Sequence, residues 1–506
     1  MIPRRPTPSG LRQFAPPGLH DQTRDWKVQS AHPAENILAG VLSLWLVFQP
    51  WAFGLMHVWS QGVALGLAAI AFLLSLWPRT LEAVPGMTGP VKTAPWRTLI
   101  ALPVFWLTLA LFSYVAIQAL NPAWSFRSSA THWWLEKNAH LGWLPSGIEA
   151  PFAGMNGWRR LFMWASPFLA GCALWIGITH RRSVRLLVVI FATNATLVGL
   201  YAMIQQFAGT RKVFWHFDFP AAAGPYGSFI YKNHAAAFLL LGIGAMGGLA
   251  WHFYLRGTAR GARSTPAPVA AFACILLLAA AGFSLSLLGL IIGVGAALML
   301  FFAGLWLAGK KSVRIWSPML GALVLLGGAA WGVLQLDRTA VEGRVRLLQE
   351  GIRHESPALR FYAADATLQM LRDHPLYGIG AGGFRHLAPL YLQQYPATIQ
   401  IVHFGMVQRQ AINYRMNETH SEPLQFAAEL GLVGGTILLL MLACGLAAVS
   451  PFGRRRHPLG MAAGITAGSL GLFAIFDFPL HNGAVLGGLV FLVVAASRWA
   501  DLESPR

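Results

Sequence analysis

The sequence predicts an all-α, polytopic membrane protein with about twelve transmembrane helices and one large extracytoplasmic helical loop domain. Three observations predict this class. First, 55% of the 506 residues are hydrophobic and only 11% are charged, whereas soluble domains carry roughly a quarter charged residues. Second, apolar runs of about 20 residues, the length of one membrane crossing, recur along the chain. Third, a polar segment of nearly ninety residues interrupts them.

The lengths of the apolar runs define the predicted helices. The run 268–309 is too long for one crossing, so we divide it at Ser284 and Ser286, the polar residues within it. The predicted helices span 36–56, 58–77, 98–120, 160–179, 186–207, 233–255, 268–286, 288–308, 315–334, 424–447, 459–477 and 480–497. The corresponding regions are a disordered cytoplasmic tail at 1–35, helices one to nine in 36–334, a periplasmic loop domain at 335–423, helices ten to twelve in 424–497, and a cytoplasmic tail at 498–506.

The excess of positive charge predicts the orientation of the chain. There are 38 Lys and Arg against 19 Asp and Glu, and 22 of these cations fall in the tails and short loops that alternate threading places in the cytoplasm. This distribution follows the positive-inside rule. It predicts a multi-pass membrane protein with both termini cytoplasmic, and it argues against a nucleic-acid partner.

The cysteines give no sign of a disulfide framework or a metal site. Cys172, Cys274 and Cys444 lie in separate apolar runs without ligand spacing. We interpret them as small buried hydrophobic residues and predict no zinc site from them.

The segment 335–423 is predicted to be the functional domain. It holds nine Arg and eight acidic residues, and a loop of this length between membrane helices is rarely a mere connection. Ser356-Pro357 and Pro375 delimit a predicted helix, with Ser356 as the N-cap. An apolar stripe on this helix is expected to lie on the membrane surface or on the bundle; it consists of Phe361, Ala364, Leu368 and Leu371. The glycine-rich turn 378–383 lets the backbone approach another element or a ligand closely.

Two further polar groups lie where predicted helices enter the membrane. His420 precedes the tenth helix, for which Ser421 or Glu422 can serve as the cap. His420 is therefore expected at the end of the bundle that faces water. Glu429 lies within the apolar run and is therefore a functional or network residue by default. Lys232, Asn233 and His234 begin the sixth helix, where an interfacial anchor is the alternative interpretation.

Five tryptophans mark the external segment 121–158. They can stack on sugar faces as an acceptor platform, although a tryptophan belt at the membrane interface is the more common explanation. The five are Trp124, Trp133, Trp134, Trp143 and Trp158.

Three motif segments occur in a fixed order along residues 186–497. The motif residues are Gly227, Phe229, Asn233 and Ala236; then Arg360, Asp373, Pro375, Gly378, Gly380 and Phe384; then His420, Leu424, Gln425, Glu429, Gly431 and Gly434. Together they resemble the O-antigen ligase and O-antigen polymerase superfamily of bacterial inner membranes. The closing segment 476–481, Phe-Asp-Phe-Pro-Leu-His, looks like one found in one branch of that superfamily.

The resemblance implies a membrane glycosyltransferase that needs no metal or cofactor, in lipopolysaccharide or exopolysaccharide biosynthesis. Its donor would be a glycan linked through diphosphate to undecaprenol. Its acceptor would be a hydroxyl on a glycan, on lipid A core or on a protein, at the periplasmic face. Membrane lipids are the remaining expected partner, and ligase, polymerase and protein glycosyltransferase remain alternatives within this class.

The resemblance also assigns candidate site residues. Arg360 is the candidate for binding the diphosphate, because a guanidinium binds such charge bidentately. His420 is the candidate base for the acceptor hydroxyl. Asn233 and Glu429 are further candidates for substrate binding, although an orienting or structural role suits Glu429 better than catalysis.

One departure from the superfamily concerns a second arginine. Many relatives carry it in a Ser-Arg-Gly turn, whereas the corresponding segment here, 283–289, has no charge. Either Lys232 or Arg211 takes its place, or donor binding is altered in this chain. We hypothesise that Lys232 does so.

Two other classes of function compete with the enzyme. A transporter of a lipid-linked glycan or an anion would also have about twelve helices, but such folds usually show repeated halves, which this sequence lacks. A scaffold without chemistry is the third hypothesis.

Overall fold

The computed structural model describes residues 33–78, 80–81, 91–92, 94–129, 133–210, 212–219, 224–309, 355–395, 399–404, 407–412, 416–449 and 457–503. Within them the chain is mostly helical, and nine helices are long and apolar enough to cross a membrane. The predicted class, an all-α polytopic membrane protein, is therefore confirmed.

Most bundle helices overlap the predicted apolar runs. The bundle helices are α2 (Pro33–Trp51), α3 (Val58–Ser75), α4 (Pro95–Ile100), α5 (Pro103–Leu120), α6 (Gly157–Gly177), α7 (Arg181–Phe207), α8 (Lys232–Ala259), α9 (Ala267–Phe283), α10 (Leu287–Ala308), α15 (Glu422–Val449), α16 (Pro458–Phe476) and α17 (Gly483–Glu503). The predicted helix 315–334 lies outside the described residues, as do residues 1–32 of the predicted tail and 335–354 of the predicted loop domain.

Short elements connect these helices. They are the single-turn helices η2 (Phe53–Leu55), η3 (Phe152–Gly154) and η6 (Pro479–His481), and a two-residue pairing of β1 (Thr80–Leu81) with β2 (Val91–Lys92).

Two breaks within apolar runs show how local sequence sets helix ends. The prediction of one helix over 98–120 was wrong, because α4 ends at Ile100 and Pro103 starts α5 as a first-turn residue, where a missing N–H costs nothing. The division of the run 268–309 is confirmed. The hydroxyl of Ser286 accepts a hydrogen bond from the Gly289 N–H at 3.1 Å and caps α10.

Both ends of the helical bundle extend into the predicted tails. Glu35, expected in the tail, is fully buried in α2, where its carboxylate accepts a hydrogen bond from the Ser183 hydroxyl at 2.7 Å. At the other end α17 continues to Glu503, and Arg498 donates to the carbonyl of Ile178 at 2.9 Å. These contacts fix the start of α2 and the last turns of α17 within the bundle.

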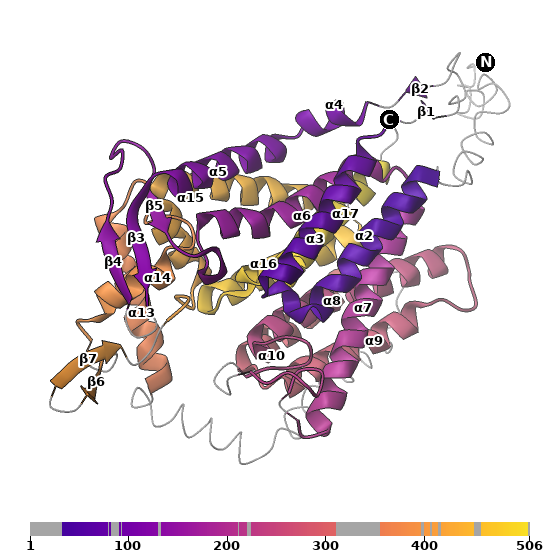
Figure 1. Cartoon of the computed structure of the whole chain (residues 1–506). Helices are drawn as coiled ribbons and strands as arrows, with labels where there is room; N and C mark the ends of the chain where they lie inside the picture. The colour runs from indigo at the N-terminus through magenta and orange to yellow at the C-terminus, as the bar shows by residue number, and fades with distance from the viewer. Residues whose placement is uncertain are drawn as a thin grey trace, which may run out of the picture.

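The extramembrane part combines two loops that are distant in sequence. The first loop forms a sheet of strand order β4-β3-β5, and the second contributes two helices and a hairpin; the elements are β3 (Pro122–Ser128), β4 (Trp133–Lys137), β5 (Gly147–Glu149), α13 (Glu355–Asp373), α14 (Phe384–Leu392), β6 (Ile399–Phe404) and β7 (Val407–Ile412). The sheet and the two helices share one apolar core around Phe126, Ala363 and Phe384. Figure 1 shows them gathered at one end of the bundle, opposite the end where α2 begins and α17 finishes.

Helix α13 packs with a different face from the predicted stripe. Ala363, Ala366 and Met370 are fully buried, whereas Phe361 is 68% exposed and Leu368 is 39% exposed. The small side chains of the buried face allow the closer packing in the domain core. The bundle therefore leaves Phe361 and Leu368 exposed, and of the two predicted locations the membrane surface stays a prediction for these two residues.

The glycine-rich turn after α13 contacts another helix. At Gly431, helix α15 is interrupted by a φ of 63°, which exposes backbone groups. The N–H of Gly380 donates to the Glu429 carbonyl at 3.0 Å, and the N–H of Leu432 donates to the Pro375 carbonyl at 2.9 Å. A Cβ at Gly378 would lie 2.5 Å from the Glu429 carbonyl oxygen, so only glycine fits there. This contact fixes the loop domain to the bundle.

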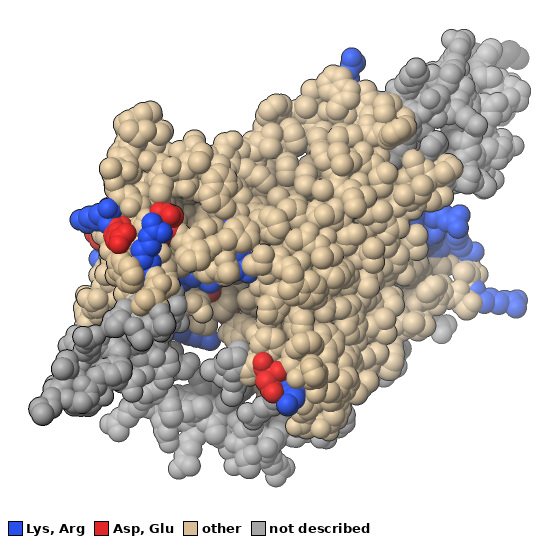
Figure 2. All heavy atoms as spheres, viewed as in Figure 1, with Lys and Arg blue, Asp and Glu red and all other residues tan. Residues whose placement is uncertain are grey.

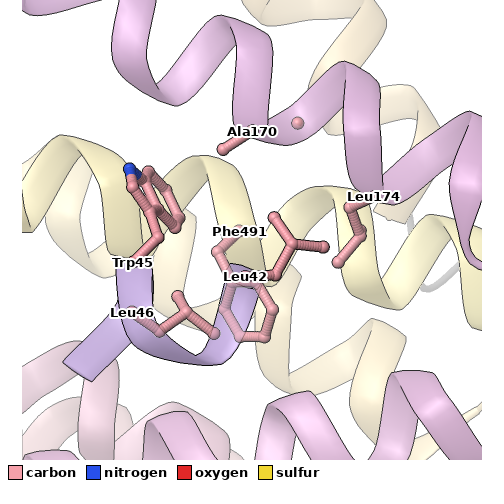
Figure 3. A pocket seen from close by; sticks show the side chains of 7 residues that line it. Leu42, Trp45, Leu46, Ala170, Leu174 and Phe491 are labelled. Atoms are coloured by element: carbon pink, nitrogen blue, oxygen red, sulfur yellow. The ribbon is translucent and has the colours of Figure 1, made fainter. Parts of the chain in front are cut away.

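The bundle interior is closely packed. One small apolar cavity of about 10 Å³ lies between α2, α6 and α17, where Leu42, Trp45 and Phe491 surround it (Figure 3). That volume holds at most about one water molecule, so this cavity has no room for a substrate. Most of the bundle face seen in Figure 2 carries no charged side chain, as expected for helices that face lipid.

Candidate active site

His420 lies immediately before α15 in a strained backbone conformation. Its φ is 61°, in the left-handed region that non-glycine residues rarely adopt. Gln425, one turn into α15, holds the preceding residues: its amide oxygen accepts from the Thr419 N–H at 2.9 Å, and its amide nitrogen donates to Glu418 at 2.6 Å. Such strain persists only where the surroundings fix the residue, and Gln425 supplies two of the fixing contacts.

A buried carboxylate faces the His420 ring. Asp477, the residue that ends α16, places Oδ1 3.3 Å from Nδ1 of His420. The Asp477 side chain is 1% exposed, whereas that of His420 is 27% exposed. Burial raises the pKa of Asp477, but the hydrogen bond and charge of His420 outweigh burial, so the pKa lies below its ordinary value. Asp477 is therefore an ionised partner for a histidine that solvent reaches.

The start of α8 contacts the second oxygen of the same carboxylate. The Tyr231 hydroxyl donates to Oδ2 of Asp477 at 3.1 Å, and the amide nitrogen of Asn233 also donates to it. The Phe478 ring stacks on Tyr231 with centroids 5.3 Å apart and lies 4.9 Å from the His420 ring. The α8 start, the loop before α15 and the turn after α16 thus converge on Asp477.

Arg360 lies beside this convergence. It is an exposed residue near the start of α13 and makes no hydrogen bond or ion pair within the described part of the chain. Burial and the charge of Asp477 raise the pKa of Tyr231, whereas the charge of Arg360 acts in the opposite direction. Arg360 is therefore within electrostatic reach of Tyr231, and its guanidinium is available to an anion.

The other predicted binding residues have different surroundings. Lys232 begins α8 next to Tyr231, with its methylene groups close to Gly224. Arg211 lies outside the described residues. Glu429 is 1% exposed, and its carboxylate accepts hydrogen bonds from the Gly382 N–H at 2.9 Å and from Gln425 at 3.0 Å. Glu429 thus supports the glycine-rich turn, while substrate binding by all three residues remains a prediction.

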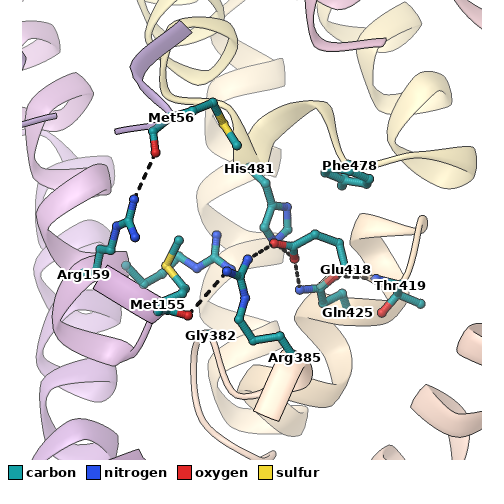
Figure 4. Close-up of polar contacts among 12 residues, drawn as sticks. Met56, Met155, Arg159, Gly382, Arg385, Glu418, Thr419, Gln425, Phe478 and His481 are labelled. Atoms are coloured by element: carbon teal, nitrogen blue, oxygen red, sulfur yellow. Dashed lines mark hydrogen bonds and ion pairs between the residues drawn. The ribbon is translucent and has the colours of Figure 1, made fainter. Parts of the chain in front are cut away.

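A buried charge network holds the His420 loop to α6 and α14. Arg385 of α14 forms an ion pair with Glu418, and Arg160 of α6 places Nη2 3.8 Å from Glu429. Figure 4 shows Arg385, Glu418 and His481 of this network near Phe478, and it shows Arg159 apart from them, donating to the Met56 carbonyl. Three elements that are distant in sequence are thereby fixed around His420.

The network sets the ionisation of its members outside the membrane-spanning helices. Burial raises the pKa of Glu418, but the charges of His481, Arg385 and Arg160 outweigh burial and bring the pKa to about 2. Burial, aided by the charge of Arg160, lowers the pKa of His481 to about 3. At neutral pH the cations that neutralise Glu418 are therefore the two arginines.

Glu418→Gln is expected to destabilise the protein at pH 7 by about 3 kcal/mol, because it leaves Arg385, whose side chain is only 18% exposed, without its counter-charge. Since the folded-state pKa of Glu418 is below the ordinary 4.5, its contribution is present above pH 4.5 and is lost as pH falls toward 2. The difference in thermal unfolding between wild type and variant, measured in detergent, should therefore shrink from pH 6 to pH 3.

Glu136→Gln, which alters an exposed pair with Arg127, should change stability by less than about 1 kcal/mol. A constant difference across this pH range would contradict the prediction.

Several site residues escaped prediction from the sequence. Asp477 and His481 were noted only as part of a resembling segment, and Arg159 and Arg160 were not singled out. Glu418 and Arg385 were counted within the mixed-charge loop. An available signal was the presence of Asp477 and Arg160 at the ends of apolar runs, where charge is expensive unless paired.

The fold and the site together define a polytopic helical membrane protein with a polar histidine–aspartate site at one end of its bundle. The model of a family described as O-antigen ligase (Wzy_C) matches residues 269–439, which confirms the predicted resemblance to the O-antigen ligase and polymerase superfamily. The match includes Arg360, His420 and Glu429, whereas Asn233 and Asp477 lie outside it. It supports a function in membrane glycan processing of the ligase or polymerase kind. Comparison with curated proteins gave no match.

Proposed function

We propose that this protein is a glycosyltransferase that moves a glycan from an undecaprenyl-diphosphate donor onto a hydroxyl of a glycan, lipid A core or protein acceptor. The observation that carries the proposal is the partly exposed His420 held by the buried carboxylate of Asp477. A histidine oriented through one ring nitrogen presents the other nitrogen to a substrate proton.

The proposed reaction assigns a proton and a leaving group to named residues. With the Nδ1 proton of His420 directed at Asp477, Nε2 accepts the proton of the acceptor hydroxyl. The acceptor oxygen forms a bond to the anomeric carbon of the donor, and the bond from that carbon to the diphosphate oxygen breaks. Undecaprenyl diphosphate leaves with the electron pair, and Arg360 stabilises the developing negative charge.

Lys232 is the proposed second cation for the diphosphate. It follows Tyr231 at the start of α8, on the element that contacts Asp477. The turn where many relatives carry arginine is here formed by Ser284 and Ser286, both 3% exposed, with the Ser284 hydroxyl bonded to the Ala281 carbonyl at 2.6 Å. That turn offers no cation, so the charge must come from another element.

The proposed location is the bacterial inner membrane, with both termini cytoplasmic and the site at the periplasmic face. The positive-inside distribution of the sequence supports this orientation. The site elements lie at the end of the bundle opposite the start of α2 and the end of α17 (Figure 1).

Transfer by the purified full-length protein in nanodiscs tests the proposed function. The donor is a synthetic undecaprenyl-diphosphate oligosaccharide, and the acceptors are lipid A core, a second lipid-linked glycan and envelope protein, each with and without EDTA. The expected result is a new glycosidic product, detected by mass spectrometry, whose yield EDTA does not change. Movement of the donor across the membrane without bond formation would replace the enzyme with a transporter, and dependence on a divalent cation would contradict metal-independent transfer.

Asp477→Asn is expected to lower kcat by about 10²-fold, because the histidine loses the carboxylate that fixes its ring and stabilises its protonated form. KM values for donor and acceptor should change little. Steady-state kinetics of the variant, with thermal unfolding as a check on folding, measure this effect. Tyr231→Phe is the control, since it removes one hydrogen bond to the same carboxylate and leaves its charge. An unchanged kcat in Asp477→Asn would exclude this role.

A further inference from the structure

The sheet β4-β3-β5 presents two faces of different chemistry. Its register pairs Phe126 with Leu135 and Arg127 with Trp134. Because paired residues of neighbouring strands lie on the same face of a sheet, these two pairs occupy opposite faces. The sheet therefore has an inner face around Phe126 and an outer face around Trp134.

The inner face connects the sheet to the candidate active site. The Phe126 ring lies 4.7 Å from the ring of His386 in α14, and His386 hydrogen-bonds the Met155 carbonyl at 2.8 Å. The neighbouring Arg385 forms the ion pair with Glu418, two residues before His420. The sheet is thus fixed to the helix that holds the His420 loop.

The outer face combines an aromatic ring with held polar groups. The indole N–H of Trp134 donates to Glu136 at 2.7 Å. Arg127 lies between two carboxylates, 3.7 Å from Glu136 and 3.4 Å from Glu149. Trp134 is 44% exposed as a residue, and the side chains of Arg127, Glu136 and Glu149 are each about half exposed. Figure 2 shows charged side chains of both signs gathered over these strands.

The charges decide between lipid and a hydrophilic ligand. Three ionised side chains around Trp134 would be costly to bury among acyl chains, so this face does not suit the membrane core. Trp158, in contrast, is 43% exposed on α6, a helix of membrane-spanning length, as expected of an interfacial residue. Trp134 thus combines an exposed ring with polar groups in fixed positions.

The same chemistry suits a glycan. The C–H face of a sugar ring packs on an exposed indole, while carboxylates accept and a guanidinium donates hydrogen bonds to the hydroxyls around the ring. The mutual contacts of Trp134, Glu136 and Arg127 hold these groups in place before a ligand arrives, which lowers the entropic cost of binding.

We propose that the outer face of the β4-β3-β5 sheet binds the acceptor glycan, with Trp134 as the stacking ring and Arg127, Glu136 and Glu149 as its polar contacts. This inference rests on the proposed function, because it assigns the acceptor of that transfer. It makes the sheet a specificity-determining surface separate from the donor site at Arg360.

Two measurements on the full-length protein in nanodiscs test the proposal. Saturation-transfer NMR uses oligosaccharides released by mild acid from the cell's own envelope glycans. Transfer kinetics use the same glycans as acceptors. Trp134→Ala is expected to weaken NMR binding and to raise KM for the acceptor about 10-fold, the effect of truncating one well-placed aromatic contact. The KM for the donor and kcat should stay unchanged.

Matched variants separate this surface from general effects. Trp143→Ala removes a tryptophan of the same segment that is 71% exposed and should leave all constants unchanged. Glu136→Gln removes one carboxylate acceptor without changing side-chain size and should raise KM for the acceptor several-fold. Equal effects of Trp134→Ala and Trp143→Ala, or an unchanged acceptor KM in Trp134→Ala, would overturn the proposal.

The outcomes also distinguish this inference from the proposed function. Wild-type transfer with an unchanged acceptor KM in Trp134→Ala would contradict only the glycan surface. Absence of transfer by wild type, with glycan binding that depends on Trp134, would contradict the proposed reaction and retain the surface. Indole fluorescence can also detect whether Trp134 binds lipid vesicles. If Trp134 bound these vesicles and not the oligosaccharides, the face would belong to the membrane and the inference would be overturned.

Discussion

His420→Ala is expected to lower the rate of glycan transfer by about 10²–10⁴-fold, the usual contribution of a positioned general base. His420 is the partly exposed histidine that Asp477 orients. Without it, the acceptor hydroxyl must lose its proton to water during attack. The measurement is kcat with the undecaprenyl-diphosphate donor and a saturating acceptor, because the missing base affects the chemical step more than substrate binding.

Controls for this variant come from the same domain. His374→Ala replaces an exposed histidine at the end of α13 and should retain wild-type activity. Added imidazole should restore part of the rate of His420→Ala, because a small base can enter the space left by the ring, whereas it should not affect a variant that fails to fold. Full activity of His420→Ala would exclude the proposed base.

Arg360→Ala should lower kcat/KM for the donor by about 10²-fold, since it removes charge-assisted hydrogen bonds to the diphosphate. Arg360→Lys should recover only part of this loss, because an ammonium lacks the planar pair of donors. Arg372→Ala is the matched control, since Arg372 is an exposed arginine in the last turn of the same helix. Equal loss in Arg360→Ala and Arg372→Ala would indicate a general electrostatic effect instead of a binding site.

Lys232→Ala tests the proposed second cation alongside Arg360. If Lys232 replaces the arginine that many relatives carry, Lys232→Ala should also lower kcat/KM for the donor, and the double variant should be the least active. Intact transfer in Lys232→Ala, together with loss in Arg360→Ala, would contradict the substitution. The donor diphosphate would then be bound without Lys232.

The fold could be predicted well because its main signals are local. The spans of α8 and α10 follow from consecutive apolar residues, and the break between α9 and α10 follows from Ser284 and Ser286. The inner face of α13 was missed because packing favoured the small residues Ala363 and Ala366 over the larger apolar stripe. Periodicity shows that a helix has an apolar side, but the partner decides which side is buried.

The candidate site was predictable only in part. Arg360 and His420 were found through resemblance, and Asn233 was found with them. Their common contact, Asp477, was not, because it lies 57 residues from His420 and 244 residues from Asn233 along the chain. Pairings over such distances leave no periodic pattern in one sequence.

The sequence by itself determined the membrane class, most helix boundaries and the candidates His420 and Arg360, because apolar run length and short motifs are properties of neighbouring residues. Only the tertiary structure decided that Asp477 orients His420, that Arg385 neutralises Glu418, and that Trp134 lies on the sheet face opposite Phe126. Each of these depends on which side chains meet after the helices pack. A buried charge is tolerated only where its counter-charge is brought to it, and that requires the folded chain.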